Sequence, residues 1–314
     1  MIKLASMRTL ILGGTGLIGG HAALYLKQRG HQVTISGRQR QLPSVFGLAD
    51  LPFVYCDYLD DSMTGDWLGA FDAIVFAAGH DPRHVPEGED ATKHLLFANG
   101  IGIPRFARLA RSAGVSCFVH IGSFYPHVVP SLVDSVPYIR SRKLAVDGVL
   151  ALNSSTFCAC SLDAPVVVGS VPGLQVPFLK ALVEYAKGDL DVPVFAPQGG
   201  TNFMSTRSLS EAIAGALNAG PTVGGKAFLV GDENLEYAAF FQLFFHALNR
   251  SVVVPALDQD HPLLPRATLY SGNTTISYEP NPQETALLGN YERGDIRQAV
   301  SEVVFQYNYE PRKA

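Results

Sequence analysis

A glycine-rich turn near the N-terminus constrains the fold more than any other feature of the chain. The segment Leu12-Gly13-Gly14-Thr15-Gly16-Leu17-Ile18-Gly19-Gly20 follows an apolar run at 9–12 and opens a helical pattern. Glycine permits a tight turn, lets backbone N–H groups approach a pyrophosphate at the helix N-terminus, and lets the helix pack close to the strand. A glycine triplet alone is weak, but this one lies between a strand and a helix, as a dinucleotide-binding fingerprint requires. The expected contact residues are Gly13, Thr15, Gly16, Leu17, Ile18 and Gly19.

Short apolar runs alternate with amphipathic stretches over the first half of the chain. Runs with the length of buried strands lie at 9–12, 32–36, 53–56, 73–77, 117–121 and 157–161. Helical apolar patterns fall between them, at 17–26, 89–113 and 137–152. Such alternation is typical of βαβ units whose parallel sheet is buried on both faces. The sequence therefore predicts an α/β fold, a Rossmann-type doubly wound parallel sheet.

The pattern changes after Asp163, where prolines and glycines interrupt a series of short elements. We expect residues 1–165 to form the dinucleotide-binding domain and residues 166–314 to form mainly a smaller, discontinuous substrate-binding module. One late strand, at 227–230, is expected to return to the main sheet. Helices are expected near 207–218, 236–249, 283–288 and 294–306.

Composition excludes several classes of protein. Lys plus Arg number 24 against 28 Asp plus Glu, and no basic run resembles the stripe that binds a nucleic acid backbone. No stretch approaches the roughly 18 uninterrupted apolar residues of a membrane helix. The four cysteines, Cys56, Cys117, Cys158 and Cys160, lie in apolar strand-like runs and are expected to be reduced thiols. The expectation is a soluble cytoplasmic protein that binds neither nucleic acid nor membrane.

The spacing of Gly13, Gly16 and Gly19 resembles that of the short-chain dehydrogenase/reductase superfamily. The long C-terminal part resembles its extended branch, the NAD(P)-dependent epimerase/dehydratase family. Four further segments carry the resemblance, namely Phe76–Gly79, Asn99–Gly102, Gly224–Phe228 and Leu287–Gly289. The resemblance implies that Ala77, Ala78 and Gly79 back the adenosine and ribose, with Asn99 on the helix that follows.

Cofactor choice is expected to depend on the end of the second strand. NAD-selective dehydrogenases usually have an acid there, for the ribose 2′-hydroxyl. Here the segment is Ser36-Gly37-Arg38-Gln39-Arg40, in which Arg38 can fork onto a 2′-phosphate and Ser36 can donate a hydrogen bond. We therefore expect NADP, with NAD as the alternative; the competing interpretation is two solvated arginines on a loop. Asp57, with the adjacent Tyr58, resembles the family's adenine-binding aspartate, although a turn-forming Asp fits equally well.

The resemblance also implies a catalytic set made of a phenol, a hydroxyl and a cation. Ser123 follows the fifth strand, and Tyr138 lies fifteen positions later in Pro137-Tyr138-Ile139-Arg140-Ser141. The family places lysine four residues after the tyrosine, whereas here that position is Arg142 and Lys143 comes one residue late. At about 100° per residue, Arg142 faces the site in a regular helix. A π-bulge would instead present Lys143, whose spacing to Asp147 matches the family's lysine-to-acid spacing.

Other residues have weaker assignments. The segment Asp163-Ala164-Pro165 resembles the family's segment before the nicotinamide-contacting loop, which implies that Pro165 lies beside the nicotinamide. Tyr125, on the loop after Ser123, is expected to line the substrate pocket. The histidines His80, His84, His94, His120 and His127 show no metal-ligand spacing on one helix face, and no metal is expected.

The leading interpretation is an NADP-dependent oxidoreductase acting on a carbonyl or secondary alcohol of a small molecule. The alternatives are a sugar-nucleotide epimerase or dehydratase of the same family and a non-catalytic NADP-binding sensor. The resemblance disfavours a nucleotide-diphosphate sugar as substrate, because family members that use one usually have a pyrophosphate-binding arginine where this chain has Asn202, and only Arg207 is nearby. A homodimer through the helices at 89–113 and 137–152 is expected.

Overall fold

A seven-stranded parallel sheet forms the centre of the computed structural model, which describes residues 6–38, 47–60, 62–265, 269–270 and 272–309. The strand order is β10-β6-β5-β4-β1-β2-β3. The strands are β1 (Arg8–Leu12), β2 (Gln32–Gly37), β3 (Phe53–Tyr55), β4 (Ala73–Phe76), β5 (Cys117–Ser123), β6 (Cys158–Ala164) and β10 (Ala227–Leu229). The order reverses between β1 and β4, and in such sheets ligands bind beyond the carboxyl ends of the strands at that point. The predicted Rossmann-type sheet is confirmed.

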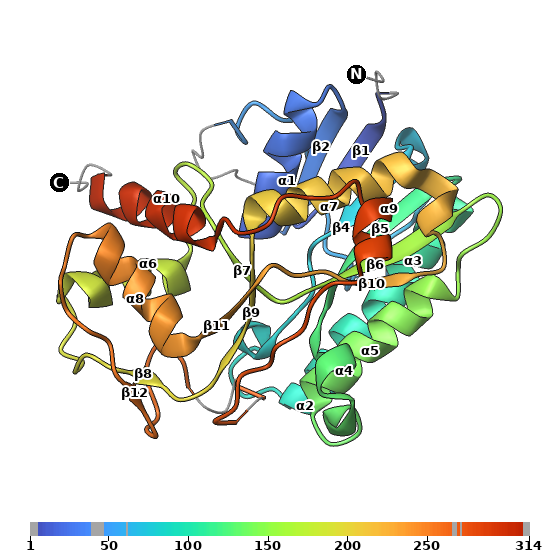
Figure 1. Cartoon of the computed structure of the whole chain (residues 1–314). Coiled ribbons are helices and arrows are strands. Elements are labelled where there is room, and N and C mark those ends of the chain that lie inside the picture. The colour runs from blue at the N-terminus through green and yellow to red at the C-terminus, as the bar shows by residue number, and fades with distance from the viewer. Residues whose placement is uncertain (1–5, 39–46, 61, 266–268, 271, 310–314) are drawn as a thin grey trace.

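Helices cover both faces of this sheet (Figure 1). On one face, α1 (Leu17–Gln28) and α7 (Thr206–Ala219) pack against Ile11, Val75 and Val119. On the other face, α3 (Ile103–Ser112) and α5 (Pro137–Leu150) enclose a core rich in aromatic rings. Burial on both faces explains why β4 is an uninterrupted apolar run and why most of the other strands are rich in apolar residues.

The helical pattern predicted over 89–113 corresponds to three consecutive helical segments, of which the middle one is a π-helix. The structure has α2 (Ala91–Leu95), the seven-residue π-helix η3 (Leu96–Gly102) and then α3. The extra residue per turn in a π-helix shifts every later side chain around the axis, which an apolar period cannot reveal. By contrast, α5 is an α-helix throughout, so the π-bulge considered for the tyrosine segment is not there.

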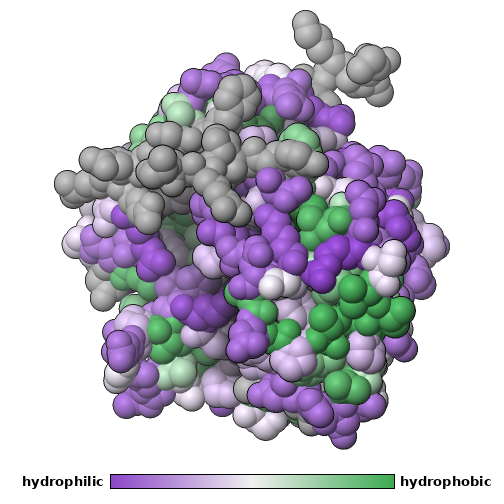
Figure 2. Space-filling view, turned by 90° about the vertical axis from the view of Figure 1, so that its left-hand side faces the viewer, coloured by the Kyte–Doolittle hydropathy of each residue, from purple (hydrophilic) through white to green (hydrophobic). Residues whose placement is uncertain are grey.

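The C-terminal half builds a second core beside the carboxyl end of the sheet (Figure 1). Its sheet has the order β11-β9-β7, made of β7 (Val166–Val168), β9 (Gly200–Ser205) and β11 (Glu233–Glu236). Three helices, α6 (Pro177–Lys187), α8 (Tyr237–Ala247) and α10 (Ile296–Tyr309), pack around aromatic residues such as Phe241 and Phe245. Figure 2 faces this module and shows hydrophobic patches among hydrophilic residues; Phe305 and Val253 are exposed large apolar side chains.

The predicted late strand near 227–230 is β10, which lies at the edge of the main sheet. Both α7 and β10 return to the main sheet, β10 by pairing with β6. The boundary at residue 165 remains a prediction. The remaining short elements are η1 (Asp66–Ala70), η2 (Pro82–His84), α4 (Tyr125–Val128), η4 (Pro130–Leu132), β8 (Ala196–Pro197), η5 (Gly220–Val223), β12 (Ala256–Leu257) and α9 (Pro282–Leu287).

Two further sequence expectations concern the whole chain. Within the described ranges, no helix is both long and apolar enough to cross a membrane. The four cysteines are buried and form no disulfide with one another.

Candidate active site

The glycine turn lies between the ends of β2 and β4. The amides of Gly13 and Gly14 both donate to the carbonyl oxygen of Ser36, at 3.0 Å. Gly13 has a φ of +81°, and a Cβ there would lie 2.6 Å from the Ala77 oxygen. A Cβ on Gly19 would lie 2.3 Å from the Gly13 oxygen. Glycine is therefore required at both positions, because backbone fills the space that a side chain would need.

The N-terminus of α1 is open to an anion. Its N-cap, Gly16, has no side chain to accept a hydrogen bond from the first-turn amides. Such amides, together with the positive end of the helix dipole, bind phosphate groups. The turn therefore fits a pyrophosphate, and Thr15, Leu17 and Ile18 lie in the same stretch of backbone.

The end of β2 leaves little room for an acid. A Cβ on Gly37 would lie 2.7 Å from Oγ1 of Thr15, so any larger side chain there would displace that threonine. Ser36 is buried, and its hydroxyl has no partner among the described residues. Arg38 is exposed and forms no ion pair within the described part of the chain. Arg40 lies outside the described residues.

The loop after β4 is held from behind by Asn99. The Asn99 side chain accepts from the backbone amide of His80 at 2.9 Å and donates to the carbonyl of His80 at 2.8 Å. It also donates to the hydroxyl of Ser141 on α5, at 3.0 Å. Asn99 thus connects the loop after β4, which contains Ala77, Ala78 and Gly79, to α5.

The two residues after β3 differ in their contacts. Oδ1 of Asp57 accepts from the backbone amide of Leu59 at 3.0 Å, which is the turn contact considered for it. The Tyr58 ring is buried edge-on to Phe76, with its hydroxyl unpartnered among the described residues. Burial raises the pKa of Tyr58, so this phenol stays protonated.

Ser123 and Tyr138 lie on neighbouring elements at the carboxyl edge of the sheet. Ser123 ends β5 and is buried, and Tyr138 lies in the first turn of α5. Tyr125 links them, because its amide is 3.5 Å from the Ser123 hydroxyl and its ring centroid is 6.3 Å from that of Tyr138. Tyr270 stacks on Tyr138 at 6.1 Å. Burial raises the pKa of Tyr125 and raises that of Tyr270 to about 12, which suits both phenols to lining the site.

The two candidate cations of α5 point in different directions. Arg142 is only 6% exposed, and its Nη2 donates to the carbonyl oxygen of Ile121 at 2.7 Å. Lys143 is on the outer surface, with Nζ 2.6 Å from both carboxylate oxygens of Asp147. The lysine-to-acid spacing is therefore an exposed ion pair one helical turn apart, which contributes little to stability.

Pro165 is buried between β6 and β7. Two residues before it, Asp163 forms an ion pair that sequence reasoning missed. Nε2 of His127 lies 2.5 Å from Oδ2 of Asp163, whose side chain is 1% exposed. No local spacing could have revealed this pair, because the partners are 36 residues apart.

Three histidines that the sequence left scattered, His80, His84 and His94, lie together beside the loop after β4. His80 stacks on His84 and His94, each at 5.2 Å between ring centroids, and its Nδ1 is 2.9 Å from Nε2 of His94. Burial lowers the pKa of His80 to about 4. Among the described residues, no group of three or more His, Cys, Asp or Glu side chains could hold a metal ion.

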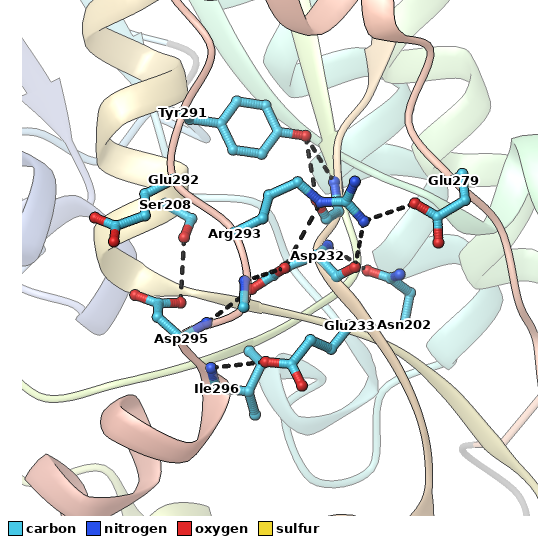
Figure 3. Close-up of polar contacts among 12 residues, drawn as sticks. Asn202, Ser208, Asp232, Glu233, Glu279, Tyr291, Glu292, Arg293, Asp295 and Ile296 are labelled. Atoms are coloured by element: carbon cyan, nitrogen blue, oxygen red, sulfur yellow. Dashed lines mark hydrogen bonds and ion pairs between the residues drawn. The ribbon is translucent and has the colours of Figure 1, made fainter.

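Polar side chains of the C-terminal module are engaged with one another (Figure 3). Asn202 is buried, accepts from the amide of Asp232 at 2.9 Å and donates to Asn234 at 2.8 Å. Arg293 donates to the Asp232 carbonyl and to Glu279, at 2.7 Å in both cases. This network ties the segment before α10 to β9 and β11.

Comparison with known proteins found one matching family model and a related curated enzyme. The model of the family described as "NAD dependent epimerase/dehydratase family" matches residues 9–218. A UDP-glucose 4-epimerase from Klebsiella pneumoniae is 29% identical over 146 residues, which are 43% of this chain and 100% of that protein.

Solved structures show the same fold at low identity. A UDP-glucose-4-epimerase from Stenotrophomonas maltophila, with bound NAD and formylated UDP-arabinopyranose, has a TM-score of 0.75 and 18% identity, over 96% of this chain and 98% of that one. The Bordetella bronchiseptica enzyme WbmH in complex with NAD+ has a TM-score of 0.74 and 17% identity, over 98% and 100% of the two chains.

Proposed function

The chain belongs to the NAD-dependent epimerase/dehydratase family, a family of enzymes, and from this premise we propose that it is an NADP-dependent oxidoreductase of small molecules. Its substrate would carry a carbonyl or a secondary alcohol. The observation that carries the proposal is the arrangement of Ser123, Tyr138 and Arg142 around the carboxyl ends of β4 and β5, next to an open helix N-terminus.

Each of the three side chains has a distinct part in the proposed reaction. Tyr138 gives a proton to the substrate oxygen, or takes one from it, and Ser123 holds that oxygen by a hydrogen bond. Arg142 supplies a positive charge beside the reacting oxygen, which stabilises negative charge that develops there. A guanidinium does not deprotonate in proteins, so Arg142 stabilises charge without passing on a proton. A nicotinamide, when bound, supplies or accepts the hydride.

The residues around the glycine turn fit NADP better than NAD. The 2.7 Å clearance at Gly37 disfavours the acid that would bind a ribose 2′-hydroxyl. Arg38, exposed at the end of β2, is positioned to bind a 2′-phosphate. Ser36, whose buried hydroxyl lacks a partner among the described residues, would serve the ribose only after a small rearrangement. Solved relatives of the same fold contain NAD, which keeps NAD as the alternative.

A direct assay tests the proposal. Purified protein is incubated with NADPH and a panel of aldehydes and ketones, while the absorbance of the reduced nicotinamide is followed. Consumption of NADPH that Tyr138→Phe removes supports the oxidoreductase. A protein that binds NADPH but turns over no carbonyl contradicts it.

A sugar-nucleotide epimerase is the second candidate, favoured by the names of its relatives. It would use the same three side chains and return the hydride, so its cofactor would remain unchanged through turnover. Conversion of a UDP-sugar without net consumption of cofactor would decide for it.

We also propose a homodimer formed by η3 and α5. Three exposed large apolar residues, Phe97, Ile101 and Leu144, lie on these two helices, and a Cβ on Gly100 would touch Leu144 at 3.3 Å. Light scattering coupled to gel filtration tests this, because Ile101→Glu should yield a monomer. The four buried, unpaired thiols support a location in the reducing cytoplasm. Cell fractionation tests this location.

A further inference from the structure

Asp163 is a buried carboxylate near the end of β6, the strand that pairs with β5. It pairs with Gly122 in the register of β5 and β6, one residue before Ser123. A buried carboxylate is costly unless it is paired and hydrogen-bonded. Asp163 has both kinds of partner, since His127 lies at 2.5 Å and the hydroxyl of Ser161 donates at 2.5 Å.

The carboxylate of Asp163 packs directly against Gly122, the residue before Ser123. A Cβ on Gly122 would lie 1.7 Å from Oδ1 of Asp163 and 2.6 Å from Oγ of Ser161. Any residue other than glycine at 122 would expel this side chain. The position of Asp163 and the path of β5 just before Ser123 are therefore coupled.

His127 connects this carboxylate to the turn that follows Ser123. It lies on α4, which has only four residues and is too short to be stable alone. The turn contains Tyr125, whose amide approaches the Ser123 hydroxyl and whose ring faces Tyr138. Besides the His127–Asp163 contact, the backbone amide of Phe124 donates to the Ala164 oxygen at 3.2 Å. Both contacts hold the turn against β6.

The surroundings of His127 favour its charged form. The hydrogen bond that His127 donates to Asp163 raises the pKa of His127. Glu284 on α9 acts in the same direction, whereas burial and Lys143 on α5 oppose it. The ring is 34% exposed, so protons exchange with solvent. A charge-assisted hydrogen bond is roughly twice as strong as a neutral one.

We propose that His127 and Asp163 are positioning residues, whose ion pair holds the Ser123–Tyr125 turn in place for catalysis while His127 is protonated. Neither side chain is assigned a contact with substrate or cofactor, and the inference rests on the proposed function for its turnover measurement. Beyond Asp163, the hydroxyl oxygen of Ser161 is 3.0 Å from Nδ1 of the buried His120, which fixes the remaining side of the carboxylate.

The test compares His127→Gln and Asp163→Asn with His246→Gln, which changes an exposed histidine on α8. Two measurements need no turnover. In an NMR titration of the unmodified protein, the pKa of His127 should lie above the ordinary value of about 6.5. In Asp163→Asn the pKa of His127 should fall toward that ordinary value. In hydrogen–deuterium exchange, peptides covering residues 122–129 should exchange about tenfold faster in His127→Gln than in the control.

The turnover arm separates positioning from binding. We expect kcat of His127→Gln to fall by about 10–100-fold with little change in KM or in the Kd for NADPH, because a misplaced catalytic group costs rate rather than affinity. In the unmodified protein kcat should decline as pH rises through the pKa of His127, and His127→Gln should abolish that decline.

The outcomes distinguish the two proposals. Absence of turnover in the unmodified protein contradicts the proposed function. Hydrogen–deuterium exchange and the NMR titration still test the positioning role of His127 and Asp163 in that case. An ordinary titration of His127, or equal exchange of residues 122–129 in His127→Gln and the control, overturns the positioning role. Unchanged kcat and pH dependence in His127→Gln also overturn it.

Discussion

The guanidinium of Arg142 lies against the backbone of Gly79, so close that a Cβ at residue 79 would fall 1.9 Å from Nη1. The same guanidinium donates to the Ile121 carbonyl. One side chain of α5 thus contacts both the loop after β4 and the strand that ends in Ser123. The glycine at 79 is needed to admit a group as wide as a guanidinium.

Arg142→Met is expected to reduce kcat/KM by about 100-fold or more, because it removes the proposed positive field at Tyr138. It also leaves the buried Ile121 carbonyl unpaired, at a cost of about 1–3 kcal/mol in the free energy of unfolding. Steady-state kinetics and urea denaturation measure the two effects.

Lys143→Met is the matched control for that substitution. Its ion pair with Asp147 is exposed, so its stability should change by less than about 1 kcal/mol and its kinetics hardly at all. A larger kinetic loss from Lys143→Met than from Arg142→Met would contradict this assignment of the cation.

The choice between these two cations shows how far the sequence reaches. Helical geometry alone points Arg142 inward, and the structure places it there, because α5 is regular. The seven strands of the main sheet were also predictable, because short runs rich in apolar and β-branched residues mark them. The π-helix around Asn99 and the pair of Asp163 with His127 were not, because both depend on contacts between distant segments.

Tyr138→Phe should abolish turnover and leave cofactor affinity nearly unchanged. The phenol oxygen is assigned to the substrate, while the dinucleotide is assigned to the glycine turn and the loop after β4. Kinetics and calorimetric titration with NADPH check the two halves. Tyr125→Phe is the control, and a loss there as deep as in Tyr138→Phe would mean that the acid has been misassigned.

Arg38→Asp should narrow or reverse a preference for NADP over NAD. The substitution removes a group that can fork onto a 2′-phosphate and adds one that repels it. Each tenfold change in the ratio of dissociation constants corresponds to about 1.4 kcal/mol. Calorimetry with both cofactors measures the ratio, and tighter binding of NAD by the unmodified protein would refute the proposal.

Stability should fall as the pH drops from about 6.5 to 4. Burial lowers the pKa of His21, His80 and His261 to about 4 in the folded protein. The unfolded chain, with pKa values near 6.5, binds more protons than the folded protein between these two pH values, so acid favours unfolding in this window. Above pH 6.5 these histidines are neutral in both states and add no such penalty.

His261 is the most informative of the three histidines, because it is fully buried against Phe195 and Phe241. Melting temperatures of His261→Gln, measured against pH, should show a shallower acid limb than those of the unmodified protein. His246→Gln, exposed on α8, should keep the original slope. An unchanged slope in His261→Gln would show that this histidine does not drive the acid limb.

The substrate is expected not to be a nucleotide-diphosphate sugar, although relatives carry that activity in their names. Two phosphate charges need a charge-assisted fork, and the candidate side chains are already engaged. Asn202 is buried and bonded to Asp232 and Asn234. Arg207 is 3.7 Å from Asp295 and 3.2 Å from Glu302, so a ligand would have to draw it away from two carboxylates. Thermal-shift measurements on NADP-saturated protein with UDP, dTDP and GDP sugars check this, because a ligand that binds only the folded state raises the melting temperature. We expect no saturable rise with any of them, whereas a rise that Arg207→Ala removes would place the pyrophosphate at Arg207 and favour the epimerase.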